Sequence, residues 1–156
     1  MYFPYSVGVL WSNATLDQNI MKNFALKEFL IKKEPIEDIV NSLDNPAIFG
    51  FSSFVWNHQY NVTLAKAVKK KFPSCIIFFG GPSVPYQDEN FLKENNFIDF
   101  VIYREGELAF VNLLNHILGK EVDMGSIGYL EENTLKTFPC HRIVNLDDIP
   151  SPYTLG

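Results

Sequence analysis

Groups that could bind a ligand lie directly after three short apolar segments of the chain. The segment 47–52 leads into hydroxyl, indole and amide side chains at Ser52, Ser53, Trp56 and Asn57. The segment 75–79 leads into Gly80, Gly81 and Pro82, and the segment 100–103 leads into Arg104, Glu105, Gly106 and Glu107. A few polar groups and open glycine backbone at such positions suit ligand binding.

Each of these groups also has an ordinary structural explanation. Ser53 or Asn57 alone is more simply a helix N-cap. Gly80 and Gly81 before a proline are more simply a tight turn, although glycines also let a ligand approach the backbone where no Cβ stands. Glu107 suits the first turn of a helix, because it complements the helix dipole. These explanations do not account for three consecutive loops of this kind.

The sequence lacks the motifs of several common catalytic and binding sites. It has neither a GxGxxG fingerprint nor a P-loop, which disfavours dinucleotides and nucleoside triphosphates. His58, His116 and His141 fit a loop, a helix surface and a linker, so no Ser-His-Asp or Cys-His set can be assembled. Cys75 and Cys140 lack metal-ligand spacing and are expected to be free thiols in a reducing compartment. We therefore predict no catalytic residue, no metal ligand, and a binding module rather than a complete enzyme.

Length and composition fit one compact domain. The chain has 156 residues, of which 47% are hydrophobic, enough for a single substantial core. Its net charge of -5 is mild, and its basic run at 69–71 falls in a predicted helix, so no nucleic-acid partner is expected. No signal peptide is apparent, and no apolar run reaches the ~18 residues of a membrane span. We expect a cytoplasmic protein without a membrane partner.

Alternating apolar segments and helical patterns predict an α/β fold. Strands are predicted at Ser6–Leu10, Phe24–Ile31, Ala47–Ser52, Cys75–Phe79 and Phe100–Tyr103, although a helix fits the second segment equally well. Helices are predicted at 35–43, 59–72 and 107–118. Such a chain forms a flavodoxin-like or Rossmann-like, doubly wound, five-stranded parallel sheet of order 2-1-3-4-5. Its ligands bind beyond the carboxyl ends of the strands, where the polar loops would meet.

The chain changes character after Gly119. Ile127–Glu131 and Leu135–Phe138 predict a small hairpin about Glu132 and Asn133, and a proline-punctuated segment follows. We interpret the hairpin as an appendage and not as a second core. The chain is therefore divided into an α/β domain at 1–120 and a hairpin with a linker at 121–156.

Three stretches resemble a known family in order and spacing. WNHQYNVTLAKAVKKKFPSCIIFFGGPSVP, DFVIYREGELAFVNLL and NLDDIPSPY are similar to the cobalamin-binding domain in the N-terminal part of B12-dependent radical SAM enzymes, over most of the chain from Ala47 onward. The resemblance implies a corrinoid at the carboxyl edge of the sheet, with the paired glycines beside its nucleotide tail. It would make cofactor-binding residues of Ser52, Ser53, Trp56, Asn57, Gly80, Gly81, Pro82, Arg104, Glu105, Gly106 and Glu107. A similar pattern near the N-terminus would add Trp11, Ser12 and Asn13, in the loop after the first strand.

The sequence departs from the family pattern in two places. It lacks the Asp-x-His-x-x-Gly motif that supplies a lower axial histidine in many cobalamin proteins, so no histidine from the loop after the first strand would bind cobalt. It also has no CxxxCxxC iron-sulfur motif before the sequence stops at Gly156. The resemblance therefore assigns the [4Fe-4S] cluster and S-adenosylmethionine to a C-terminal radical SAM domain of the same polypeptide.

Three functions remain open from the sequence. In the first, the chain positions a corrinoid for a radical SAM domain, with methyl transfer the implied reaction. In the second, it is a cofactor-free scaffold of the same fold that docks the catalytic domain. In the third, it binds flavin mononucleotide, although the residues at 11–15 supply only part of a Ser/Thr-rich phosphate loop.

Overall fold

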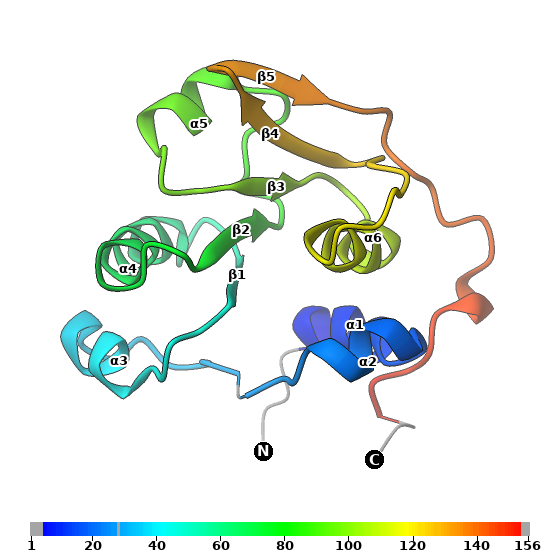
Figure 1. Ribbon diagram of the computed structural model, residues 1–156, viewed down its shortest axis with the longest axis horizontal. Helices are drawn as coiled ribbons and strands as arrows, with labels where there is room; N and C mark the ends of the chain where they lie inside the picture. The colour runs from blue at the N-terminus through cyan, green and yellow to red at the C-terminus, as the bar shows by residue number, and fades with distance from the viewer. Residues whose placement is uncertain (1–4, 28, 154–156) are drawn as a thin grey trace.

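Helices lie on both faces of a five-stranded sheet in the computed structural model, which describes residues 5–27 and 29–153 (Figure 1). The strands, in their order across the sheet, are β1 (Ile48–Ser52), β2 (Ile76–Gly80), β3 (Phe100–Ile102), β4 (Ile127–Glu131) and β5 (Thr134–Thr137). The pairs β1–β2 and β2–β3 are parallel, and the pairs β3–β4 and β4–β5 are antiparallel. The α/β class and the five-stranded sheet predicted from the sequence are confirmed.

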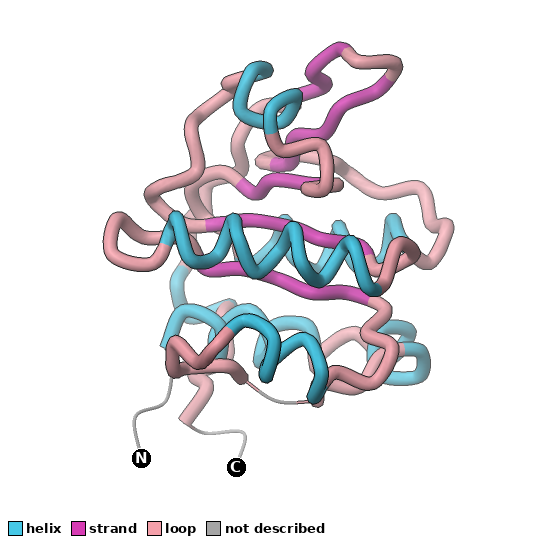
Figure 2. The backbone as a smooth tube through the Cα atoms, turned by 90° about the vertical axis from the view of Figure 1, so that its left-hand side faces the viewer, coloured by secondary structure: helices cyan, strands magenta, loops and turns pink. Residues whose placement is uncertain are grey.

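The helices flank the parallel strands. They are α1 (Tyr5–Ala14), α2 (Gln18–Asn23), α3 (Ile36–Ser42), α4 (His58–Lys71), α5 (Glu89–Glu94) and α6 (Glu107–Ile117), with a short 3-10 helix at Leu146–Asp148. Figure 1 shows α3 and α4 on one side of β1 and β2, and α1, α2 and α6 on the other; Figure 2 shows α4 running along the parallel strands. The three helices predicted from the sequence are found as α3, α4 and α6. In the described part of the chain, no helix is long and apolar enough to cross a membrane.

The N-terminal part of the chain differs from the prediction. Ser6–Leu10 belongs to α1 and not to a strand, because the segment continues to Ala14 as a helix that buries residues 8, 9, 12 and 14. A short apolar run does not distinguish a strand from a buried helix by its periodicity. Phe24 caps α2, and residues 25–27 and 29–31 form no strand; Glu28 lies outside the described residues.

The order 2-1-3-4-5 is therefore wrong for this sheet. The three later predicted strands are present as β1, β2 and β3, and the other two strands of the sheet come from the hairpin β4–β5. This hairpin turns at Glu132 and Asn133 as predicted, with φ angles of 48° and 63° that suit a two-residue turn. It pairs with β3 and so extends the sheet, whereas the sequence suggested an appendage. The division of the chain after residue 120 stays a prediction.

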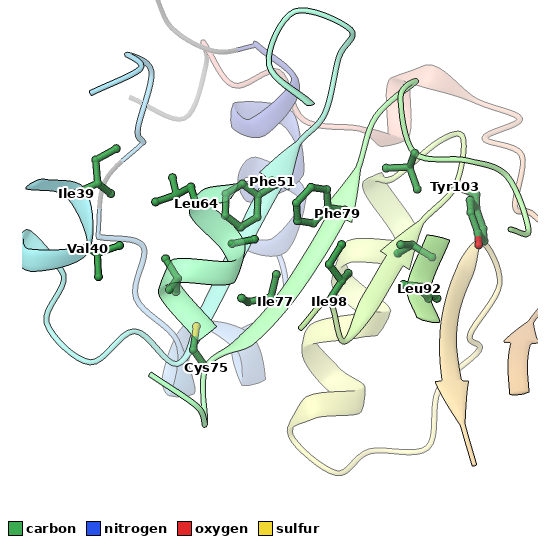
Figure 3. Packing of buried hydrophobic residues seen from close by; sticks show 14 residues of the cluster. Ile39, Val40, Phe51, Leu64, Cys75, Ile77, Phe79, Leu92, Ile98 and Tyr103 are labelled. Carbon is green, nitrogen blue, oxygen red and sulfur yellow. The ribbon is translucent and has the colours of Figure 1, made fainter. Parts of the chain in front are cut away.

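The sheet separates two hydrophobic clusters. On the side of α4, Phe51 and Phe79 stack with their ring centroids 4.7 Å apart and pack in one cluster with Leu64 (Figure 3). On the side of α6, Phe78 lies 5.5 Å from the ring of Phe110. β2 and β3 thus bury both faces, as expected for strands covered by helices on both sides, whereas β1 buries only Phe51 and exposes Gly50 on its other face.

Candidate functional site

The turns after β1 and β2 meet at one edge of the sheet. Ser52 and Gly80, the last residues of these parallel strands, are paired in register. β3 lies beside β2 with the same direction, so the turn at 104–106 begins at the same edge. The structure therefore brings together the three polar loops that the sequence predicted to meet.

Ser53 joins the first two turns. It is fully buried, and its N–H donates to the carbonyl of Gly80 at 2.7 Å, while its own carbonyl accepts the N–H of Ser83 at 3.1 Å. Its Oγ lies 2.7 Å from Nδ1 of His58. Since none of these contacts caps a helix, Ser53 is a link between two turns and not an N-cap.

Two asparagines brace the turn after β1. Asn57 stands at the N-cap position of α4, yet its side chain makes no cap hydrogen bond. Its Oδ1 accepts the N–H of Phe54 at 2.7 Å, and its Nδ2 donates to the carbonyl of Ser52 at 3.0 Å. Asn61, which is 8% exposed, donates to the same carbonyl at 3.1 Å. Asn61 was missed in the sequence analysis. The one signal that could have found it is its position three residues before Leu64, which puts a polar amide on the apolar face of α4.

The tip of this turn presents aromatic surface. The rings of Phe54 and Trp56 are stacked, with centroids 4.7 Å apart and planes 8° from parallel. Trp56 is 71% exposed and Val55 is 89% exposed. An exposed, flat, apolar surface beside polar groups is typical of a contact site for a ligand or for another protein surface.

The two glycines at the end of β2 differ in how much room their surroundings leave for a side chain. Gly81 has a φ of +100°, and a Cβ there would lie 2.6 Å from the carbonyl oxygen of Ser53, so the chain itself requires glycine. A Cβ on Gly80 would meet Ile102 at 3.8 Å, which is ordinary contact. The local packing therefore requires glycine at position 81 but not at position 80. Pro82, which follows, is exposed.

The turn after β3 is charged. Arg104 has a φ of 59°, a left-handed conformation that is uncommon for a residue with a side chain. Its guanidinium carbon lies 5.2 Å from the ring centre of Tyr86. Glu105 accepts the N–H of Ile143 through Oε2 at 2.5 Å, which ties the C-terminal segment to this turn. Gly106 follows at the N-cap position of α6 and has no side chain to cap the helix.

Glu107, the first residue of α6, contains an unpaired polar atom. Its Oε2 is buried and has no hydrogen-bond partner among the described residues. A buried acceptor without a donor costs free energy, and a ligand that offered an N–H would remove that cost. The helix-dipole explanation accounts for the position of Glu107 but not for this buried oxygen.

The three N-terminal candidates do not follow a strand. Trp11, Ser12 and Asn13 all lie within α1, since the predicted first strand is a helix. Trp11 packs against the core on the α6 side, and Ser12 is 6% exposed. Asn13 does contact the site, because its Nδ2 donates to the carbonyl of Glu107 at 2.9 Å. Of the three, the structure brings Asn13 to the turn after β3.

Thiol and metal chemistry find little support in the described residues. Cys75 and Cys140 are both free, as predicted, and burial raises the pKa of the Cys75 thiol to about 11. Within residues 5–27 and 29–153, no three His, Cys, Asp or Glu side chains are grouped as metal ligands would be. The turn after β1 contributes neutral amides, hydroxyls and aromatic rings, and the Lys33 ammonium donates to the carbonyl of Trp56 at its tip. The turn after β3 contributes charged side chains of its own.

Comparison with known proteins defines the class to which this fold and site belong. The family model described as "B12 binding domain" matches residues 9–114. The chain therefore belongs to the B12-binding domain family, and it is a cobalamin-binding domain.

The chain is similar to part of three longer methyltransferases. The cobalamin-dependent radical SAM methyltransferase TokK of Streptomyces tokunonensis is 28% identical over 159 residues, which covers 99% of this chain and 23% of TokK. The 2-(S-pantetheinyl)-carbapenam-3-carboxylate methyltransferase of Streptantibioticus cattleyicolor is 24% identical with the same coverage. The uncharacterized methyltransferase PH0819 of Pyrococcus horikoshii is 31% identical over 121 residues, 75% of this chain and 26% of that protein. The chain thus spans about a quarter of the length of these relatives, and the resemblance inferred from its sequence is confirmed.

Proposed function

We propose that the turns after β1, β2 and β3 hold the corrinoid of a methyltransferase. The same polypeptide would carry a radical SAM domain, which binds the [4Fe-4S] cluster and S-adenosylmethionine. The family match and the three relatives support this proposal. Cobalamin supplies the methyl carrier when it is bound, and the work of this chain is to bind and orient it.

The buried Oε2 of Glu107 is the observation that carries the assignment of the site. It lies at the carboxyl edge of the sheet without a hydrogen-bond donor in the described part of the chain. The rim of a corrin ring bears neutral amides, whose N–H groups are the donors that this oxygen needs. The side chain of Asn13 donates to the carbonyl of Glu107 and fixes the backbone at the start of α6, and a rotation of the Glu107 side chain would bring Oε2 to a rim amide.

The neutral part of the site fits the rest of the cofactor. Trp56 and Phe54 offer a stacked, exposed apolar surface to a large flat ring. Gly80, whose carbonyl accepts the N–H of Ser53, stands at the position that the resemblance gives to the nucleotide tail. Ser52 and Ser53 engage their backbones within the turn, which keeps this surface rigid before the cofactor arrives. Preorganisation of this kind lowers the cost of binding.

His58 has a structural part in this proposal. Its Nδ1 is hydrogen-bonded to the buried hydroxyl of Ser53, and its ring lies 5.8 Å from that of Phe91. Both contacts orient the imidazole toward the interior of the turn. Because the Asp-x-His-x-x-Gly motif is absent, no histidine from the segment after Ser6–Leu10 would bind cobalt.

Titration with hydroxocobalamin tests the proposed site. The purified protein is titrated by visible absorbance and then desalted; we expect a spectral change and retained colour. Glu107→Ala should weaken binding by about tenfold, the effect of one hydrogen bond to a charged group. Glu121→Ala, a change of an exposed glutamate outside the site, is the matched control. A colourless protein with an unchanged spectrum would contradict the proposal, and a yellow fluorescent one would point to flavin.

The cellular setting is part of the same proposal. The chain has two free cysteines, one of them buried, which is typical of proteins kept in a reducing compartment. We place the protein in the cytoplasm on this ground. Fractionation of cells that express it, followed by immunoblotting, tests the location.

A further inference from the structure

Arg104 is held in one position by its backbone and by an aromatic ring. A φ of 59° is strained for arginine, and such strain persists only where the surroundings fix the conformation. Tyr86, from the loop between β2 and α5, lies under the guanidinium at 5.2 Å. Tyr86 is itself packed edge-to-face against the buried ring of Tyr103 at 5.1 Å. The backbone of Arg104 is therefore fixed, and its exposed guanidinium rests against the ring of Tyr86.

The positive charge of Arg104 has no counterion within the described residues. None of the ion pairs found in this part of the chain includes Arg104. The adjacent Glu105 uses Oε2 to accept the N–H of Ile143. Tyr86 stays neutral, because its hydrogen bond with the Cys140 thiol raises the pKa of the phenol. A fixed, unpaired guanidinium thus stands at the edge of the sheet that carries the other site residues.

The rim amides of cobalamin are neutral, so they need no cationic partner such as a guanidinium. The anion of the cofactor's tail is the phosphodiester that joins the corrin to its nucleotide, and the planar fork of arginine binds phosphate oxygens in pairs. Tyr86, which holds the guanidinium, belongs to the loop that begins at Gly80 and Gly81. We infer that Arg104 binds the tail phosphate and so makes this domain selective for corrinoids that contain it. The inference rests on the proposed function.

Three corrinoids separate a phosphate contact from a general effect on the site. Cobalamin has the phosphate and the nucleotide, cobinamide phosphate has the phosphate alone, and cobinamide has neither. Dissociation constants for each are measured by absorbance titration with the wild type and with Arg104→Gln. We expect Arg104→Gln to weaken cobalamin and cobinamide phosphate by about tenfold, the effect of one charge-assisted contact. The affinity for cobinamide should stay the same.

Two further variants keep the result interpretable. Arg142→Gln, which alters the other arginine of the chain, should leave all three affinities unchanged. Arg104→Gly removes the side chain and the strained φ together, so it should weaken the two phosphate-containing ligands while the protein unfolds no earlier on heating. Equal losses for all three corrinoids, or none, would overturn the role of Arg104 while the proposed function stands. If the wild type binds none of the three, the proposed function itself fails.

Discussion

The turns after β1 and β3 lie at the same edge of the sheet but are built on opposite principles. The turn after β1 is neutral and bonded inward: two asparagines donate to the carbonyl of Ser52, and Ser53 is linked to the glycine turn beside it. The turn after β3 is charged and strained at Arg104, and it leads into Glu107, whose Oε2 has no hydrogen-bond partner among the described residues. The first arrangement stabilises the fold, whereas in the described part of the chain the second leaves polar groups unsatisfied.

The contrast suggests different roles for the two turns: the turn after β1 supports the site, and the turn after β3 is the one we expect to recognise a ligand. Groups whose hydrogen bonds are already made inside the protein have little left to offer a ligand, but they fix its surroundings. Groups held in place without partners are available for a ligand, at some cost to stability. Changes in the β1 turn should therefore lower stability, and changes in the β3 turn should alter binding with little or even favourable effect on stability.

The largest expected effect comes from Gly81→Ala. An added Cβ would lie 2.6 Å and 2.9 Å from the backbone oxygen and nitrogen of Ser53, at a φ of +100°. We expect a loss of about 3 kcal/mol in the free energy of unfolding, from strain and from displacement of the turn after β1. Urea denaturation measures it.

Gly80→Ala is the matched control for this substitution. A Cβ there meets Ile102 at 3.8 Å, so stability should change by less than about 1 kcal/mol. Cobalamin binding should nevertheless weaken, because the methyl group occupies backbone surface that we assign to the cofactor. Equal stability of the two alanine variants would contradict the account of the neutral turn.

The next effect concerns the shared carbonyl of Ser52. Asn61→Ala removes one of its two side-chain donors, and we expect a loss of about 1 to 2 kcal/mol, since the amide is buried. Asn57→Ala should cost a similar amount. In the double variant the carbonyl loses both donors, so the combined loss should exceed the sum of the single losses. A strictly additive cycle, measured by urea denaturation, would show that the two amides act independently.

The sequence predicted the elements around the site better than the site's internal contacts. β1, β2 and β3 are short apolar runs, α4 and α6 have helical periodicity, and glycine or proline follows α4, β2 and β3. The apolar run at Ser6–Leu10 predicts a strand where α1 forms, because so short a run has no distinguishing period. The link from Ser53 to Gly80 and the left-handed Arg104 depend on contacts between distant segments, which no local pattern encodes. Asn57, read alone, fitted an N-cap that its side chain does not form.

A smaller effect of opposite sign is expected in the β3 turn. Arg104→Gly relieves the strained φ of 59°, and it should raise the free energy of unfolding by about 1 kcal/mol. Arg104→Ala keeps the strain and so should bring no such gain. Thermal unfolding of the two variants measures the difference. A lower melting temperature for Arg104→Gly would mean that the Arg104 side chain stabilises the fold, and the contrast between the two turns would fail.

The smallest expected effect tests how α6, which begins at the charged turn, is held to the rest of the domain. Asn115 of α6 donates to Asp17 Oδ2 at 2.7 Å, and this hydrogen bond, with those from the Ile20 and Asn19 N–H groups, lowers the pKa of the Asp17 carboxyl. A carboxyl whose pKa is lowered by folding stabilises the protein above its unfolded pKa of about 3.9, and the contribution is lost as the pH falls through the folded value.

Below about pH 4 we therefore expect amides of α2 and of the last turn of α6, where Asn115 lies, to exchange hydrogen faster, while the turn after β1 at Ser53 keeps its protection. Asp17→Asn, which cannot titrate, should remove this pH dependence. Because Asp17 is partly exposed, solvent screens the effect and its size should be modest. Hydrogen exchange read by mass spectrometry at pH 7 and pH 3.5, corrected for the intrinsic exchange rate, compares the two regions directly. Loss of protection in α2, in the last turn of α6 and in the turn after β1 together would show that these segments form one cooperative unit. The neutral turn would then not hold its structure independently.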